Sequence, residues 1–326
     1  MKRILAFALI LLMLFSSCST EKTIGTDYDF TETAKKTVQA VQKKFPEPVV
    51  GSTGGEWMLL NERRLPGFTV SEEREAIYYE NLCTLLTESD GVLSSTKSTE
   101  YSRVILALSA MGKDVTNVAG FDLLKKGFGS MEFVAKQGLS GAVFALLALD
   151  AGKLESPEGS DVTREALIDY ILENEYPEGG WAIMGTQADV DATAQALQAL
   201  AAYRDDERVA TAIDRALILL SERQTPEGGF YAWDGINSQT AAEMIIALTT
   251  LGIDVRTDPR FIKENGWLGS FLMEYYLGNG SFCITKGGKG NDLATDACLR
   301  ALISILRFDS GKSPFYDVIQ NATTNS

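Results

Sequence analysis

The chain repeats one pattern at an interval of about fifty residues, and a fixed period of this length is typical of helical repeat architectures. Each copy has a glycine-rich turn, an aromatic residue at its end, and then an apolar segment rich in Ala, Thr and Leu. The turns and the segments that follow them are Pro177–Trp181 with Asp191–Leu200, Pro226–Phe230 with Gln239–Leu248, and Gly278–Phe282 with Leu293–Leu302. The pattern predicts an all-α fold built from repeated helix pairs.

The expected helices alternate in character along the chain. Those that follow the turns are apolar on most faces, as in Ala241–Thr250, whereas those before the turns carry charges on one face, as in Glu207–Arg223. A helix that is apolar all round is buried on every side. The alternation therefore predicts two concentric layers, and about six helix pairs can close into a ring without exposed repeat ends. We expect about a dozen helices and no strand.

The turn residues and the first residues of the helices have predicted structural roles. The aromatic residues Trp181, Phe230 and Phe282 are expected to wedge between neighbouring helix pairs. Several helices begin at residue types that favour the N-cap position, where a side-chain oxygen accepts a backbone N–H. These starts are Asp189 or Asp191, Asn237-Ser238, Asn291-Asp292 and Ser98-Thr99.

Composition excludes several classes of function. The 326 residues carry a net charge of −14, and neutralising phosphates requires clustered Lys and Arg that this chain lacks, so a nucleic-acid partner is not expected. The chain has no His, which excludes Ser-His-Asp and Cys-His catalysis and His-ligated zinc. We expect no metal site and no cofactor.

The N-terminus indicates an exported, lipid-anchored protein. Lys2 and Arg3 precede an apolar run, Ile4–Phe15, that is too short to span a bilayer but fits a secretory signal. The run ends at Ser16-Ser17-Cys18, which resembles a bacterial lipobox, in which the cysteine is diacylated. We expect residues 1–18 to be a lipoprotein signal, 19–29 a tether and 30–322 a single toroid domain on the extracytoplasmic face of the membrane. The alternative is an ordinary cleaved signal.

Three further cysteines, Cys83, Cys283 and Cys298, form no CxxC motif. Buried thiols are the expected state, and a Cys283–Cys298 disulfide is the alternative that an oxidising compartment permits.

The repeats resemble a known family. Squalene cyclases carry a repeat of the form Q-xxx-G-x-W, and two turns of this chain have a similar spacing: Gln224, Gly228 and Phe230, and Glu175, Gly179 and Trp181. From Phe30 to Asp317 the chain resembles the prenyltransferase and squalene-oxidase repeat family, whose fold is the α/α toroid. The segments Glu100–Leu108 and Thr257–Lys263 are similar to a bacterial secreted branch of it. That branch often occurs beside domains similar to the C-terminal part of vitamin B12 carriers.

The resemblance implies few catalytic residues. Protein prenyltransferases bind zinc through Asp, Cys and His, and complement-type toroids carry a Gly-Cys-Gly-Glu-Gln thioester; this chain has neither the His nor the thioester run. Class II terpene cyclases use Asp-x-Asp-Asp, whose middle Asp is the proton donor. Here Asp189-Val190-Asp191-Ala192 places Asp191 at the donor position, preceded by Asp189, and replaces the last Asp with Ala192. Burial would raise the pKa of such a carboxyl and let it protonate an alkene.

Other residues are candidate ligand contacts because they combine aromatic or charged groups with loops or a central position. Glu56 and Trp57 follow a glycine pair, in a loop of the kind that often carries binding residues, although a structural plug is the alternative. Tyr101 and Arg103 can reach a central cavity, or form an outer-layer salt bridge. The remaining candidates form a rim of aromatic residues for an apolar ligand: Tyr231, Trp233, Tyr275 and Tyr276.

Three hypotheses about function follow. The first is a non-catalytic binding module that holds a small apolar ligand, a corrinoid-like ligand or a partner protein, because a ring of helices offers a concave, mostly apolar site. The second is an isoprenoid-processing enzyme, similar to a class II cyclase, in which Asp191 is the general acid. The third is a structural surface scaffold.

Overall fold

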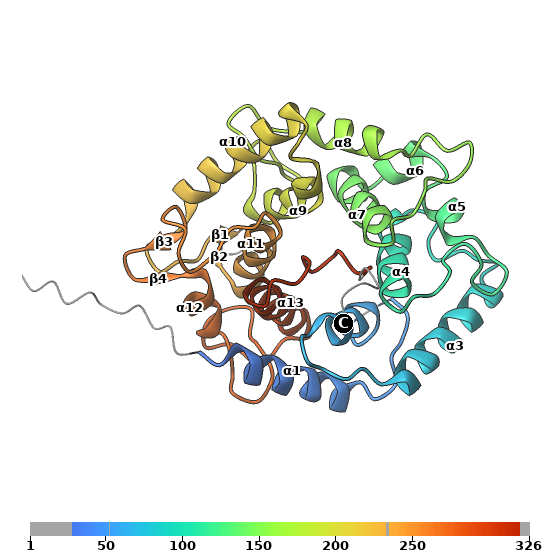
Figure 1. Ribbon diagram of the computed structural model, residues 1–326, viewed down its shortest axis with the longest axis horizontal. Helices are drawn as coiled ribbons and strands as arrows, with labels where there is room; N and C mark the ends of the chain where they lie inside the picture. The colour runs from blue at the N-terminus through green and yellow to red at the C-terminus, as the bar shows by residue number, and fades with distance from the viewer. Residues whose placement is uncertain (1–27, 52, 233–234, 320–326) are drawn as a thin grey trace, which may run out of the picture.

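The structure is a computed structural model that describes residues 28–51, 53–232 and 235–319. Its helices form two concentric layers, an α/α toroid, as the sequence predicts (Figure 1). The inner helices are α2 (Glu56–Arg64), α4 (Ser98–Ala110), α7 (Gly138–Ala151), α9 (Val190–Leu200), α11 (Ser238–Thr250) and α13 (Asp292–Asp309). The outer helices are α1 (Phe30–Lys44), α3 (Glu72–Glu88), the short α5 (Leu123–Gly127) and α6 (Met131–Ala135), α8 (Arg164–Glu173), α10 (Glu207–Arg223) and α12 (Leu268–Met273).

The inner ring closes on itself. Each inner helix packs against the next, and α13 packs against both α11 and α2, so that the last repeat meets the first (Figure 1). Outer helices alternate with inner ones along the chain, so the inner helices run in the same direction. Their N-terminal ends therefore lie at one mouth of the toroid and their C-terminal ends at the other.

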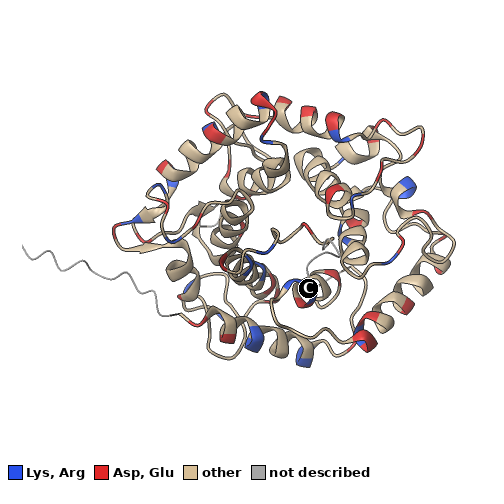
Figure 2. Cartoon of the chain, viewed as in Figure 1, with Lys and Arg blue, Asp and Glu red and all other residues tan. Residues whose placement is uncertain are grey.

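Side-chain chemistry explains which helices are inside. Ten of the fourteen residues of α7 are buried, and none of the fourteen carries a charge except Asp150. In α10, by contrast, the buried residues recur every three or four positions, at Val209, Ala212, Ile213, Ala216, Leu217 and Leu220. A stripe of this kind fits a helix that packs on one side and meets water on the other. Figure 2 shows most charged positions along the outer helices, with a smaller number on the inner ring.

The glycine turns hold the repeats together, as expected. Trp181, Phe230 and Phe282 are fully buried. The indole of Trp181 donates to the carbonyl of Ile171 at 2.7 Å, and its backbone N–H donates to Thr193 Oγ1 at 2.9 Å. Gly180 has φ +78°, and a Cβ there would lie 2.8 Å from Thr193 Oγ1, so this position requires glycine.

The N-caps agree with the sequence at three repeats and differ at one. Asp189, Asn237 and Asn291 each accept a backbone N–H three residues ahead, at 2.7, 2.9 and 3.0 Å. The expectation for Ser98 is wrong: α4 begins at Ser98, and the N–H of Thr99 donates to Gln137 Oε1 at 2.9 Å. The side chain of Gln137, which is distant in sequence, therefore acts as the N-terminal acceptor of α4.

Three smaller features complete the description. Two hairpins of two-residue strands, which the sequence did not predict, occupy turns: β1 (Tyr231–Ala232) with β2 (Gly235–Ile236), and β3 (Ile262–Lys263) with β4 (Gly266–Trp267). Cys83, Cys283 and Cys298 are free thiols, so the alternative disulfide is not formed. Within the described ranges, no helix has both the length and the apolar character needed to cross a bilayer.

The segment after α13 turns back into the centre of the ring (Figure 1, dark red). Phe315 and Tyr316 are buried there. Arg64 Nη2 donates to the carbonyl of Pro314 at 2.6 Å, and Arg307 Nε donates to that of Ser313 at 2.8 Å. We call residues 313–319 the C-terminal segment; it fills part of the space that the toroid encloses.

Candidate functional site

The buried ionic groups of the inner helices meet beside the C-terminal segment. Arg300 Nη2 on α13 lies 3.5 Å from Glu243 Oε1 on α11 and 3.7 Å from Asp296 Oδ2 one turn earlier on its own helix. All three side chains are largely shielded from solvent, with 9, 12 and 13% of their surface exposed. Two carboxylates therefore share one guanidinium in the interior of the fold. We call Glu243, Asp296 and Arg300 the central cluster.

Polar and aromatic neighbours hold the central cluster in place. Gln198 Nε2 on α9 donates to Glu243 Oε2 at 2.9 Å, and Asn61 Nδ2 on α2 donates to Asp296 Oδ1 at 2.8 Å. Arg300 Nη1 donates to the hydroxyl of Tyr316 at 3.0 Å. The guanidinium of Arg300 also lies over the ring of Trp57, 4.7 Å from its centroid, a cation–π contact. Four inner helices and the C-terminal segment thus converge on one arginine.

A cavity of about 480 Å³ adjoins this network. Its inner wall includes Gln198 and Tyr316, which connect it to Glu243 and Arg300. Its remaining lining comes from the C-terminal ends of inner helices and from the C-terminal segment: Leu147, Asp150, Ala151, Lys153, Ala199, Ala201, Ala202, Thr250, Pro314 and Asp317. The lining combines small apolar side chains with polar and charged groups. Small-molecule sites also combine apolar walls with a few polar groups that orient the ligand. We call this space the central cavity.

Asp296 makes the stability of the fold depend on pH. Burial raises the pKa of its carboxyl from the ordinary 3.8 to about 6; Arg300 and Asn61 oppose the rise and Glu243 adds to it. Because the folded-state pKa is above the unfolded one, the native state holds this proton more tightly. The contribution of Asp296 to stability therefore falls as pH rises from about 4 to about 6.

We expect Asp296→Asn, which keeps an acceptor for Asn61, to remove this dependence. A shift of about two pKa units corresponds to about 3 kcal/mol. In urea unfolding between pH 4 and pH 7, the stability of the variant relative to wild type is expected to increase through the window and level off above it. A difference that stays constant at every pH would contradict the assignment.

The residues predicted from the cyclase motif come together at the opposite mouth. Asp189 and Asp191 line a pocket of about 630 Å³ with Tyr231, at the N-terminal end of α9. Arg223 closes the pocket from α10 and donates to the carbonyl of Ala188 at 2.5 Å. We call this the α9 pocket. Trp233, predicted for the same rim, lies outside the described residues.

The two aspartates of the α9 pocket have structural positions. Asp189 is the N-cap: its Oδ1 accepts from Ala192, and its Oδ2 accepts from the N–H of Ile183 at 3.3 Å. Asp191 lies in the first turn of α9. The positive end of the helix dipole stabilises the charged form of a carboxylate at such a position. Asp189 therefore caps α9, as the capping interpretation predicts, and Asp191 follows it in the first turn.

The other predicted contact residues lie in several different places. Glu56 and Trp57 begin the helix α2 and do not lie in the expected loop. Glu56 is buried and accepts from Tyr78 OH at 2.7 Å and from Arg103 Nε at 3.1 Å. Arg103 therefore forms a salt bridge between two inner helices, and not the outer-layer salt bridge given as its alternative. Tyr101 is buried in the core, where its hydroxyl accepts the N–H of Leu93 at 3.1 Å. These residues brace α2, α3 and α4. Among them and Trp57, only Trp57 touches the central cluster.

Tyr275 and Tyr276 lie after α12 and pack on aromatic neighbours. Tyr275 is buried against Phe271, with ring centroids 5.1 Å apart, and burial raises its pKa to about 12. Tyr276 packs on Phe282 in a tilted geometry, with ring centroids 5.0 Å apart. Neither residue lines the central cavity or the α9 pocket.

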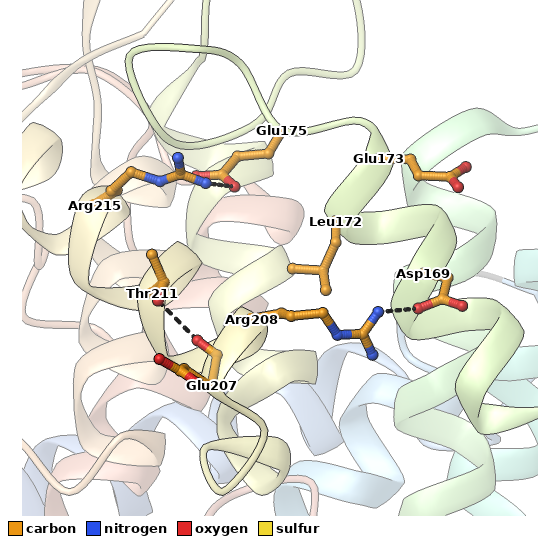
Figure 3. A pocket seen from close by; sticks show the side chains of 8 residues that line it. All are labelled: Asp169, Leu172, Glu173, Glu175, Glu207, Arg208, Thr211 and Arg215. Atoms are coloured by element: carbon orange, nitrogen blue, oxygen red, sulfur yellow. Dashed lines mark hydrogen bonds and ion pairs between the residues drawn. The ribbon is translucent and has the colours of Figure 1, made fainter.

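A third space, of about 620 Å³, is a groove on the outer surface between α8 and α10 (Figure 3). Arg208 pairs with Asp169 across it at 2.8 Å, and Arg215 pairs with Glu175 at 2.5 Å. Both of its arginines are thus engaged in ion pairs. The Arg208–Asp169 pair is exposed, and surface pairs of this kind contribute little to stability.

The sequence interpretation missed the central cluster, although a signal exists. Gln198, Glu243, Asp296 and Arg300 are polar residues within helices that are rich in apolar residues. Asp296 and Arg300 are four residues apart, so they lie on one face of α13. A polar residue on a helix that is buried on all sides needs a partner across the core. That requirement marks these positions from the sequence alone.

Comparison with known proteins supports the fold. No protein-family model and no curated protein sequence matches the chain. The type II terpene cyclase MstE from Scytonema, in its apo form, superposes with a TM-score of 0.55 at 13% identity, covering 86% of this chain and 99% of the cyclase. A structure of UGL, an α/α-toroid glycosidase, with dGlcA-Glc-Rha-Glc superposes with a TM-score of 0.56 at 13% identity, covering 88% of this chain and 98% of that chain. The chain therefore has a terpenoid cyclase-like toroid fold.

Proposed function

We propose that this protein is a non-catalytic binding protein that holds a small, largely apolar ligand in the central cavity. The observation that carries the proposal is the central cluster, which lies behind a cavity of about 480 Å³ and is linked to it through Gln198 and Tyr316. Ligand pockets for small molecules have volumes of about 300–1,000 Å³. Buried charges are unfavourable for folding, so their convergence at one cavity supports a role in ligand recognition.

The lining indicates the chemistry of the ligand. Leu147 and Ala199 offer apolar contacts to the body of the ligand. The amide of Gln198 and the hydroxyl of Tyr316 offer hydrogen bonds to a polar end. An isoprenoid alcohol has this division between an apolar body and a polar end. A corrinoid, suggested by the resemblance to vitamin B12 carriers, is the second probe.

The second candidate function is an isoprenoid-processing enzyme that acts through Asp191. The α9 pocket favours it, because Asp189 and Asp191 both line a space large enough for a substrate. Two observations weigh against it: Ala192 replaces the last Asp of the cyclase motif, and Asp189 is engaged as an N-cap.

Ligand-dependent thermal unfolding separates these candidates. A ligand present at a hundred times its Kd stabilises the native state by about 2.7 kcal/mol, which raises Tm by several degrees. We expect an isoprenoid or corrinoid probe to raise the Tm of wild type and of Asp191→Asn. The same probe is expected to leave the Tm of Ala202→Phe, which fills the mouth of the central cavity, unchanged. If the probe raises the Tm of Ala202→Phe but not that of Asp191→Asn, the result favours the enzyme.

We also propose that the protein is anchored to the extracytoplasmic face of a bacterial membrane through a lipid on Cys18, which lies outside the described residues. Two acyl chains anchor a protein stably, whereas one is marginal. Wild type is expected in the membrane fraction and labelled by radioactive palmitate, and Cys18→Ser is expected to lose the label. Labelling of Cys18→Ser at the wild-type level would refute the lipobox assignment.

A further inference from the structure

A separate, smaller pocket lies where α2, α4 and the C-terminal segment meet. It has a volume of about 230 Å³ and is lined by Arg63, Arg64, Ala110 and Val318. Two of these four side chains are guanidinium groups from the last turn of α2. The pocket is thus cationic, in a chain whose net charge is −14.

The two arginines differ in how their charge is balanced. Arg63 forms a bidentate pair with Glu75, with Nε and Nη2 each 2.5 Å from a carboxylate oxygen. Arg64 is buried, and among the described residues it has no ion pair with a carboxylate. All of its side-chain hydrogen bonds there come from Nη2, which donates to the carbonyls of Ser313 and Pro314 and to Ser313 Oγ. Its Nε is buried and has no hydrogen-bond partner in the same part of the chain.

The charges around Arg64 leave a positive excess. Arg307 on α13 is also buried and lowers the pKa of Arg64, whereas Asp317 acts on both arginines in the opposite direction. With Arg63 balanced by Glu75 and one of the two buried arginines balanced by Asp317, one positive charge remains among the residues that the structure describes. Burial lowers the pKa of Arg64 to about 9, so it is still protonated at neutral pH. A buried charge without a counter-ion is unfavourable, and an anion in the pocket would compensate it.

We propose that this pocket is an anion site that binds a small oxyanion, a phosphate or a carboxylate, through Arg64 with Arg63 beside it. The planar guanidinium fork matches the oxygens of both groups. The C-terminal ends of α2 and α4 carry partial negative charge and oppose an anion, so binding depends on the arginine side chains. Because the bound anion would contact α2 and lie against Val318, it would also fasten the C-terminal segment over the central cavity.

Isothermal titration calorimetry on the purified full chain tests the site, with inorganic phosphate and succinate as separate probes at constant ionic strength. We expect saturable binding of one of them, and at least about a tenfold loss of affinity in Arg64→Gln, since a hydrogen bond to a charged group is removed. Arg208→Gln, in the ion-paired surface groove, is the matched control and should bind as wild type does. Vesicles of phosphatidylglycerol form a third arm, which distinguishes a lipid headgroup from a free anion.

Ala110→Phe keeps the proposal testable if Arg64→Gln fails to fold. It fills the pocket from α4 and leaves every arginine in place, so it should abolish binding while the chain keeps its helical circular dichroism. Absence of saturable binding by wild type in all three arms would overturn the proposal. Equal loss of affinity in Arg208→Gln and Arg64→Gln would also overturn it, because binding would then reflect general charge.

Discussion

Replacing Arg300 with Met is expected to lower the free energy of unfolding by about 3–5 kcal/mol at neutral pH. The guanidinium is the shared partner of Glu243 and Asp296, and it also donates to Tyr316. Burial disfavours its charged form, but Tyr316, Asp296 and Glu243 together raise its pKa above the ordinary value. Without Arg300, two buried carboxylates face each other with no counter-charge. Equilibrium urea unfolding measures the loss.

Two further variants make this expectation specific. Arg208→Met removes an exposed guanidinium that pairs with Asp169 at the surface, and should change stability little. Removing all three charges of the central cluster, as Glu243→Gln, Asp296→Asn and Arg300→Met together, should recover much of the loss, since replacing a whole buried ion cluster is often nearly neutral. If Arg300→Met alone cost no more than Arg208→Met, the central cluster would not be an interacting unit.

Replacing Trp181 with Ala is expected to cost about 3–5 kcal/mol, as is usual for a large aromatic residue in a core. The indole is fully buried between helix pairs and donates to Ile171. The substitution leaves a cavity and an unpaired carbonyl at the junction of two repeats. Phe230→Ala and Phe282→Ala are expected to cost similar amounts, since both side chains are also fully buried.

Tyr231→Ala is the control for these wedges. Tyr231 directly follows Phe230 but is 69% exposed, so its removal should change stability by no more than about 0.5 kcal/mol. Thermal and urea unfolding of the four variants give the comparison. If Tyr231→Ala lowered the free energy of unfolding as much as Phe230→Ala does, burial of the side chain between helix pairs would not be the cause of the effect.

The repeated sequence pattern was sufficient to predict the toroid because each repeat contains all the residues that form its own turn, wedge and N-cap. The turn glycines, the wedge Trp181 and the cap Asp189 lie close together in sequence, and their contacts are formed within one repeat. Ser98 marks the limit of this reasoning: it has a suitable residue type for an N-cap, but Gln137 bonds the start of its helix from 38 residues away.

The candidate site was harder to predict because its contacts join distant repeats. Asn61 donates a hydrogen bond to Asp296, which is 235 residues away in sequence, and Arg64 donates one to the carbonyl of Pro314, which is 250 residues away. The C-terminal segment reaches the centre only because the ring closes and places α2 beside α13. Glu56 and Trp57 illustrate the same point: they are adjacent in sequence, yet Glu56 braces α3 and α4 whereas Trp57 packs on Arg300.

The most direct test of a ligand in the central cavity is native mass spectrometry of protein purified from cells supplied with isoprenoids and cobalamin. The Cys18→Ser background removes any covalent lipid from the measured mass. We predict a persistent additional mass in this background and with Asp191→Asn added, and its loss when Gln198→Leu is added instead. A clean unliganded mass, or an additional mass that disappears with Asp191→Asn and survives Gln198→Leu, would contradict the proposal.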